Sequence, residues 1–449
     1  MLVAVVATFV IGYLAIVLEH PLKVDKTVPA LLAGVICWAL IALGHLPVIG
    51  EGHEVESSKE VLLYHMGEIA QILFFLIGAM VIVELVDLHQ GFSVITSRIR
   101  TKNKKKLLWL ISFLGFFLSA ILDNLTTTIV LVSLLRRLIP DRNERIWFVS
   151  FVVIAANAGG AWTPIGDVTT TMLWIGEKVS TVGLIEHLVL ASLSCLIFPL
   201  LIANFLPIFK GNIKLEEKKN GEREEHTQLL SSKTMLVAGI GGLVFVPVFK
   251  AITGLPPYMG MMLSLAVVWL ISEFIHPGED FSEERKHMYT AKHALSRIEM
   301  SSILFFLGIL LAVAALEAVV AGTHPDGHSI GFLGNMAEQL QKTIPNTDIV
   351  VVILGFLSAI VDNVPLVAAV MGMYPMDLFP MDAKLWQFIA YTAGTGGSIF
   401  IIGSAAGVAA MGMERIDFIW YFKKIAWIAL IGYLAGVVVF QLFYKLFIL

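Results

Sequence analysis

The most constraining feature of this sequence is a series of apolar segments that each match the thickness of a membrane. Such segments recur along the chain, as in Leu2–Leu18, Val28–Leu46, Ile69–Val86 and Ile425–Phe443. A helix needs about 20 apolar residues to cross a hydrocarbon layer about 30 Å thick. Only 15% of the 449 residues are charged, whereas soluble domains carry about 25%. Because helices satisfy their own backbone hydrogen bonds inside a bilayer, the sequence predicts an all-α polytopic membrane protein.

Lysine and arginine residues gather in alternate loops, and this pattern predicts which way the chain faces. Lys23 and Lys26 share one short loop, and larger clusters lie at 98–106, 136–145, 210–233, 285–297 and 415–424. Basic loops stay on the cytoplasmic side of a membrane. We therefore place these loops inside a bacterial cell and predict that both termini face the periplasm, across the inner membrane.

Two segments are predicted to enter the membrane and turn back. Residues 107–135 lie between the basic residues Lys106 and Arg136, but two crossings need about 40 residues. A re-entrant hairpin resolves this conflict; one long tilted helix is the alternative and would place Arg136 outside. Residues 349–376, with acidic flanks, predict a second hairpin that enters from the other side. About ten crossing helices and two hairpins result.

An internal repeat relates the two halves of the chain. Ser119-Ala-Ile-Leu-Asp-Asn124 resembles Ser358-Ala-Ile-Val-Asp-Asn363, and Ile72-Leu-Phe-Phe-Leu-Ile-Gly78 resembles Ile303-Leu-Phe-Phe-Leu-Gly308. The predicted orientation runs the copies in opposite directions, which is the inverted-repeat plan of many secondary transporters. The predicted organisation is scaffold helices at 1–66, a first repeat at 67–207 with a broken helix at 146–176, a cytoplasmic linker at 208–233, scaffold helices and a cytoplasmic loop at 234–297, and a second repeat at 298–449 with a broken helix at 385–413.

Acidic residues fall at the predicted hairpin tips. Asp123-Asn124 and Asp362-Asn363 lie near the middle of the two hairpins. A carboxylate at membrane depth costs at least about 2–3 kcal/mol, so it marks function by default. Capping of the second hairpin arm is the alternative role for these residues.

Glycines interrupt both predicted broken helices. The first break contains a proline and lies between Asn157 and the pair Asp167 and Thr169; the second contains Ser398. Glycine and proline disfavour a continuous helix, although close helix packing would also use glycine. The glycines predicted to break the helices are Gly159, Gly160, Gly166, Gly396, Gly397 and Gly403.

The predicted midplane offers oxygen ligands, and no lysine, arginine or histidine falls within it. Hard cations prefer oxygen ligands with negative charge, and burial favours the protonated form of a carboxyl group. One site could thus hold Na⁺ or H⁺ in turn, with Na⁺ predicted at Asp123, Asn157, Asp167 and Asp362. The full set of candidate ion- and proton-binding residues is Asp123, Asn124, Thr126, Asn157, Asp167, Thr169, Ser358, Asp362, Asn363 and Ser398.

Nearly the whole chain resembles the NhaD-type sodium/proton antiporters of the ion-transporter superfamily, which also includes dicarboxylate/sodium symporters and arsenite permeases. The two S-A-I-x-D-N hairpins and the N-A-G-G-A-W-T-P-I-G-D-V-T stretch carry the resemblance. It implies exchange of Na⁺ or Li⁺ for H⁺, an elevator-like mechanism and a homodimer, with no cofactor, catalytic residue or nucleic-acid partner. It also implies roles in transport for Asp123, Asn157, Asp167, Thr169, Ser358, Asp362 and Asn363. Leu122 departs from the family, which has an acid before the first tip aspartate, so the stoichiometry does not follow.

Two other functions remain open at this point. An anion, arsenite or dicarboxylate permease of the same superfamily would share the fold, but three buried acids disfavour an anionic substrate. An intramembrane aspartyl protease would also use paired membrane aspartates. It would not need an inverted duplication, so the repeat favours transport.

Overall fold

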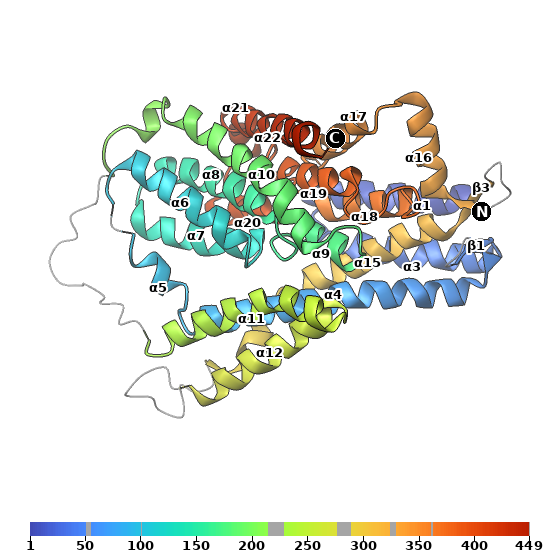
Figure 1. Ribbon diagram of the computed structural model, residues 1–449, viewed down its shortest axis with the longest axis horizontal. Helices are drawn as coiled ribbons and strands as arrows, with labels where there is room; N and C mark the ends of the chain where they lie inside the picture. Colours follow the sequence, from blue (N-terminus) through green and yellow to red (C-terminus); the bar gives the residue numbers. More distant parts are fainter. Residues whose placement is uncertain are drawn as a thin grey trace.

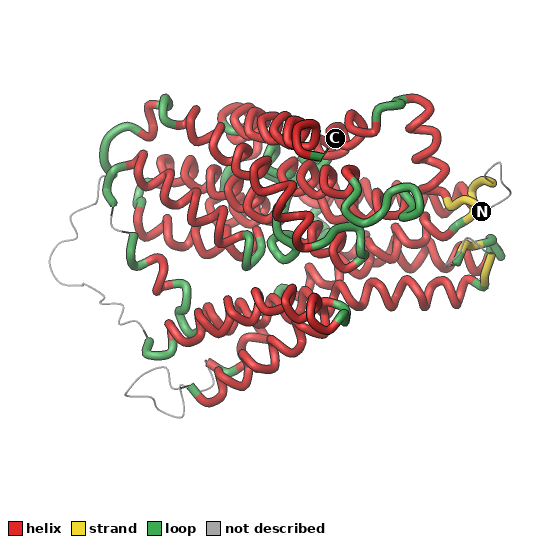
Figure 2. Tube along the Cα trace, viewed as in Figure 1, coloured by secondary structure: helices red, strands yellow, loops and turns green. Residues whose placement is uncertain are grey.

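The computed structural model describes residues 1–50, 55–99, 101–213, 229–275, 289–323, 329–360 and 362–448, and helices dominate it (Figure 1). Most of the predicted linker, at 214–228, and the residues 276–288 of the next basic loop lie outside the described residues. The strands form two short antiparallel pairs at one end of the molecule (Figure 2), and they are β1 (Val48–Ile49) with β2 (Val55–Glu56) and β3 (Val320–Thr323) with β4 (Ser329–Gly331).

The predicted count of about ten crossing helices corresponds to ten elements of the described chain, of which six are long and apolar enough to cross a membrane by themselves. These six helices are α4 (Ser58–Leu88), α10 (Thr181–Ala203), α11 (Ser232–Thr253), α12 (Pro257–Phe274), α15 (Met300–Ala318) and α22 (Ala426–Phe447). Two shorter apolar helices add to them, α1 (Leu2–Val17) and α3 (Thr27–Leu43). Two broken helices complete the ten, α8 (Arg142–Gly160) with α9 (Val168–Ile175) and α19 (Lys384–Gly396) with α20 (Ala405–Glu414).

The two predicted hairpins are formed by pairs of shorter helices. The first pair is α6 (Lys104–Ser119) and α7 (Asn124–Leu138), and the second is α17 (Thr347–Leu357) and α18 (Asn363–Met373). α16 (Phe332–Thr343) meets α17 at 117°, so these two helices do not form one straight span. The remaining short helices are α2 (Glu19–Leu22), α5 (Ser93–Thr96), a 3-10 turn at Pro207–Phe209, α14 (Ala291–Arg297) and α21 (Phe418–Lys424).

Contacts at the helix ends show that the repeats run in opposite directions. Val48, before α4, pairs with Val319, after α15, whereas Arg297, before α15, forms an ion pair with Asp87 near the end of α4. Corresponding helices of the two repeats are therefore antiparallel. The two broken helices are also antiparallel, because Arg145 at the start of α8 forms a 2.9 Å ion pair with Glu414 at the end of α20.

The helices pack as two groups. The scaffold group consists of α1, α3, α4, α11, α12 and α15, in which α3 packs along α15 and α12 along α4. The core group consists of the two hairpins, the two broken helices, α10 and α22. In Figure 1, α4, α11 and α12 lie along the lower side and α8, α10 and α22 in the upper part. Residues 148–161 and 385–399 are all buried, which places the broken helices at the centre of the core group.

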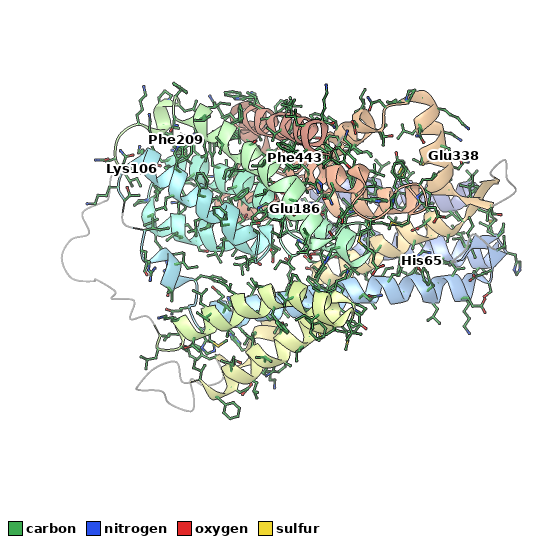
Figure 3. The ribbon with its side chains drawn as sticks, in the orientation of Figure 1. His65, Lys106, Glu186, Phe209, Glu338 and Phe443 are labelled. Carbon is green, nitrogen blue, oxygen red and sulfur yellow. The ribbon has the colours of Figure 1, made fainter. Side chains whose placement is uncertain are left out.

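The positions of two charged residues and of the two termini relate the ends of the molecule to the predicted orientation. Lys106 and Glu338 lie at opposite ends (Figure 3). Lys384, at the start of α19, donates a hydrogen bond to Gln441 near the C-terminus at 2.8 Å. Met1 contacts the region of Gly44 at the end of α3. Both termini therefore lie toward the end that was predicted to face outside; the side itself stays a prediction.

Two equivalent glycines allow each hairpin to touch its broken helix. A Cβ atom at Gly159 would overlap the carbonyl oxygen of Phe116 in α6, and one at Gly396 would overlap that of Gly355 in α17. Gly159, Gly160 and Gly396 remain helical, so close packing, and not unwinding, explains them. Gly166, Gly397 and Gly403 do lie in the breaks, as predicted.

We expect Gly396→Ala to lower the free energy of unfolding by about 1–3 kcal/mol, because backbone atoms must shift to admit the methyl group. Thermal melting of the detergent-purified protein measures the effect. Gly241→Ala in α11 is the matched control, since no atom beyond its own stretch of helix backbone would lie within 4 Å of the added methyl group, and it should melt at or slightly above the wild-type temperature. Equal melting temperatures of the two variants would contradict the close contact between Gly396 and α17.

Candidate functional site

Four interruptions of helical structure meet in the core group: the two hairpin tips and the two helix breaks. Each second arm starts at a residue whose side chain caps it, namely Asp123 for α7, Asp167 for α9, Asp362 for α18 and Ser404 for α20. Helix N-termini present unpaired N–H groups, which such side chains satisfy. Two further hydroxyls fasten the hairpins, because Ser119 donates to the Ala156 carbonyl at 2.6 Å and Ser358 to the Ala393 carbonyl at 2.8 Å.

Asp167 is the centre of this site. Its side chain is only 2% exposed, and one oxygen accepts both the N–H and the hydroxyl of Thr169 at 2.9 Å. The Asn124 amide donates to the other oxygen at 2.5 Å, and the Asn363 amide lies 3.4 Å from both oxygens. Both hairpin tips thus converge on one buried carboxylate.

Asn157 links this carboxylate to the second break. Its oxygen accepts from the Asn124 amide at 3.0 Å. Its own amide donates to the hydroxyls of Ser398 and Ser404, each at 2.9 Å. The chain of polar contacts therefore runs from the first tip through the first break to the second break, and it joins both repeats.

Asp123 faces its own helix instead of this network. Its two oxygens accept from the N–H and the hydroxyl of Thr126 at 2.7 and 2.9 Å. Its backbone has φ 141° and ψ 164°, a region that glycine occupies and that costs other residues about 1–3 kcal/mol. Thr126 thus serves as a capping partner here. Strain of this kind clusters at functional sites, so the conformation keeps Asp123 a candidate.

Asp362 has a partner that the sequence did not predict. The Lys26 ammonium group lies 3.1 Å from its carboxylate. The prediction that no basic side chain reaches the midplane residues was wrong, because the short helices α1 and α3 bring their connecting loop down to the hairpin tip. No sequence signal marked this contact, since Lys26 has the pattern of an ordinary cytoplasmic loop residue.

Ser404 is a further member of this site that was not among the residues predicted from the sequence. It follows Gly403 as Asp167 follows Gly166, so the repeat alignment could have identified it. Two backbone carbonyls of the first break also have donors: the Thr170 hydroxyl donates to the Asp167 carbonyl at 2.9 Å and the Thr171 hydroxyl to the Pro164 carbonyl at 2.8 Å.

Comparison with known proteins relates this arrangement to transporters. A family model described as "Citrate transporter" matches residues 13–396. "Sodium/proton antiporter 1" of Arabidopsis thaliana is 47% identical over 442 residues, covering 97% of this chain and 71% of that protein. "Na(+)/H(+) antiporter NhaD" of Alkalimonas amylolytica is 29% identical, with 97% of this chain and 89% of that protein covered.

A solved structure shares the fold. The crystal structure of the Alcanivorax borkumensis YdaH transporter matches with a TM-score of 0.58 and covers 94% of this chain and 98% of that chain. The two sequences are 12% identical, so this likeness concerns the fold alone.

The strained backbone at Asp123 gives a test of the local structure. Asp123→Gly should relieve the strain and lose little capping free energy, whereas Asp123→Ala keeps the strain and loses about 1 kcal/mol of capping. We expect the glycine variant to be the more stable of the two by about 1–3 kcal/mol, measured by thermal or denaturant unfolding. An alanine variant as stable as the glycine variant would contradict the positive φ angle.

Proposed function

We propose that this chain, which belongs to the citrate transporter family and to its NhaD-type sodium/proton antiporters, exchanges Na⁺ or Li⁺ for H⁺ across a membrane. The names of its antiporter relatives support this activity. The buried Asp167 carboxylate, on which both hairpin tips converge, is the observation that carries the proposal.

The geometry around Asp167 suits a cation that takes the place of N–H donors. Asn124 and Asn363 now direct their amide N–H groups toward the carboxylate. Rotation of each amide would present its oxygen instead, because an asparagine carries both a donor and an acceptor on one planar group. A Na⁺ ion would then lie among carboxylate, amide and hydroxyl oxygens, which is the chemistry that hard cations prefer.

Proton exchange uses the same carboxylate in its neutral state. A protonated Asp167 carries no charge, and a Na⁺-bound Asp167 carries none together with its ion. A bare carboxylate resists transfer through the apolar barrier because a charge at the centre of a bilayer costs about 3 kcal/mol or more. Only the loaded or the protonated site would therefore move, which couples the two ions.

The arrangement of the helices supports an elevator-like movement. The hairpins and broken helices, which hold the site, pack together in the core group, while α3 with α15 and α4 with α12 form the scaffold. We propose that the core group slides against the scaffold group with the ion. The cycle needs no cofactor and no covalent step.

We also propose a homodimer in a bacterial inner membrane with both termini on the periplasmic side. The resemblance to the antiporters supports the dimer, and the alternate basic loops support the orientation. Relatives occur in plants as well as bacteria, so localisation of a tagged protein in its source cells is the test of the membrane.

Replacement of the central carboxylate tests the proposal. Asp167→Asn keeps a side chain that caps helices well, so the protein should fold, but Na⁺- or Li⁺-driven proton movement in proteoliposomes loaded with a pH-sensitive dye should be lost. Asp417→Asn is the matched control, because Asp417 also caps a helix, through the Trp420 N–H at 2.8 Å, but lies outside the site.

Three outcomes of the proteoliposome assay distinguish the proposed exchange from its alternatives. Loss of exchange in Asp167→Asn with normal exchange in Asp417→Asn supports the proposal. Retained exchange in Asp167→Asn removes that residue from the mechanism. Absence of any cation response in the wild-type protein, together with uptake of a labelled dicarboxylate or arsenite, would favour the anion permease instead.

A further inference from the structure

The ion pair between Lys26 and Asp362 joins the scaffold group to the core group. Lys26 precedes α3 of the scaffold, and Asp362 lies at the tip of the second hairpin. Their charged atoms are 3.1 Å apart, and the two side chains are 26% and 17% exposed. The residue after Asp362, Asn363, lies against Asp167. The residue that follows Asp362 in the sequence therefore contacts the central carboxylate of the site.

A difference between the repeats explains why Asp362 takes this partner. Asp123 receives two hydrogen bonds from Thr126. The equivalent residue in the second hairpin is Pro365, which has neither a backbone N–H nor a hydroxyl group. Among the described residues of its own hairpin, Asp362 accepts one long hydrogen bond of 3.3 Å, from the Val364 N–H to one carboxylate oxygen. Its other oxygen accepts from Lys26.

The scaffold holds Lys26 firmly in place. The Lys26 backbone N–H donates to Glu19 at 3.4 Å. The neighbouring Thr27 hydroxyl donates to the Ser301 carbonyl of α15 at 3.0 Å, and the ammonium group lies 4.4 Å from the centre of the Phe305 ring, also on α15. A lysine fixed in this way can receive the hairpin carboxylate without moving the scaffold.

We propose that Lys26 is a positioning residue for exchange: its ammonium group occupies Asp362 while no transported cation is bound, and the arriving cation displaces it. The inference rests on the proposed function and deepens it. A Na⁺ ion that binds Asp167 and also takes the carboxylate of Asp362, whose neighbour Asn363 contacts Asp167, would compete with Lys26 for that carboxylate, because both carry one positive charge. Displacement would also break a contact between scaffold and core, which links ion binding to the freedom of the core to move.

The competition makes a prediction about affinity. Lys26→Met keeps the length and apolar stem of the side chain but removes its charge. In this variant the half-saturating Na⁺ concentration should fall about tenfold, because Na⁺ no longer competes with a tethered cation, and tenfold corresponds to about 1.4 kcal/mol. Lys26→Arg should stay close to wild type. The measurement is the rise in melting temperature of the purified full-length protein with increasing NaCl, with choline chloride added to constant ionic strength.

Lys250→Met is the matched control. Lys250 also contacts an aromatic ring, with its ammonium group 5.1 Å from the centre of Trp174, and donates to the Trp174 carbonyl at 3.3 Å. No carboxylate pairs with it among the ion pairs of the described residues. This variant should keep the wild-type half-saturating concentration. If Lys26→Met does not fold, Lys26→Gln is measured in its place, because glutamine can still donate a hydrogen bond but carries no charge.

The outcomes separate this inference from the proposed function. A lower half-saturating concentration in Lys26→Met alone supports the role of Lys26. A lower melting temperature with an unchanged half-saturating concentration, or an equal change in Lys250→Met, overturns it and leaves only a structural contact. A wild-type protein without any response to Na⁺ or Li⁺ overturns the proposed function, and the inference with it.

Discussion

The structure depends on the burial of one carboxylate, that of Asp167, among helices that otherwise offer apolar surface. A buried charge must be met by donors or by an ion, and three of the four interruptions of helical structure supply donors to it. The two hairpin tips contribute Asn124 and Asn363, and the start of α9 contributes Thr169. Without the breaks, these groups would lie along continuous helices and could not converge on one point.

The inverted repeat produces this convergence but does not make the site symmetric. Ser119 and Ser358 fasten the two hairpins by equivalent hydrogen bonds, and equivalent glycines admit each hairpin to its broken helix. The chemistry then differs at equivalent places. An aspartate caps α9 whereas Ser404 caps α20, and Thr126 supports Asp123 whereas Pro365 leaves Asp362 to Lys26. The three acids thus have three different environments.

The difference among the acids gives each a distinct part in the proposed exchange. Asp167 lies within reach of both hairpin tips, which suits direct binding of the transported ion. Asp362 forms an ion pair with a lysine of the scaffold group. This position suits a role in coupling ion binding to movement of the core group. Asp123 holds a strained turn through its bonds to Thr126. A single substitution at each position therefore disturbs a different step, and equal effects from all three are not expected.

The sequence by itself determined the membrane class, the repeat and the hairpins, because each depends on local patterns of apolar length, charge and glycine; the residues that bind a cation stay a prediction. It also placed Asn124, Asn157, Asp167 and Asn363 among the candidates, and these four lie in contact. Only the tertiary structure decided which acid is central and that Lys26 meets Asp362. Those facts depend on how antiparallel repeats pack, and a contact between residues 336 positions apart leaves no mark on the local sequence.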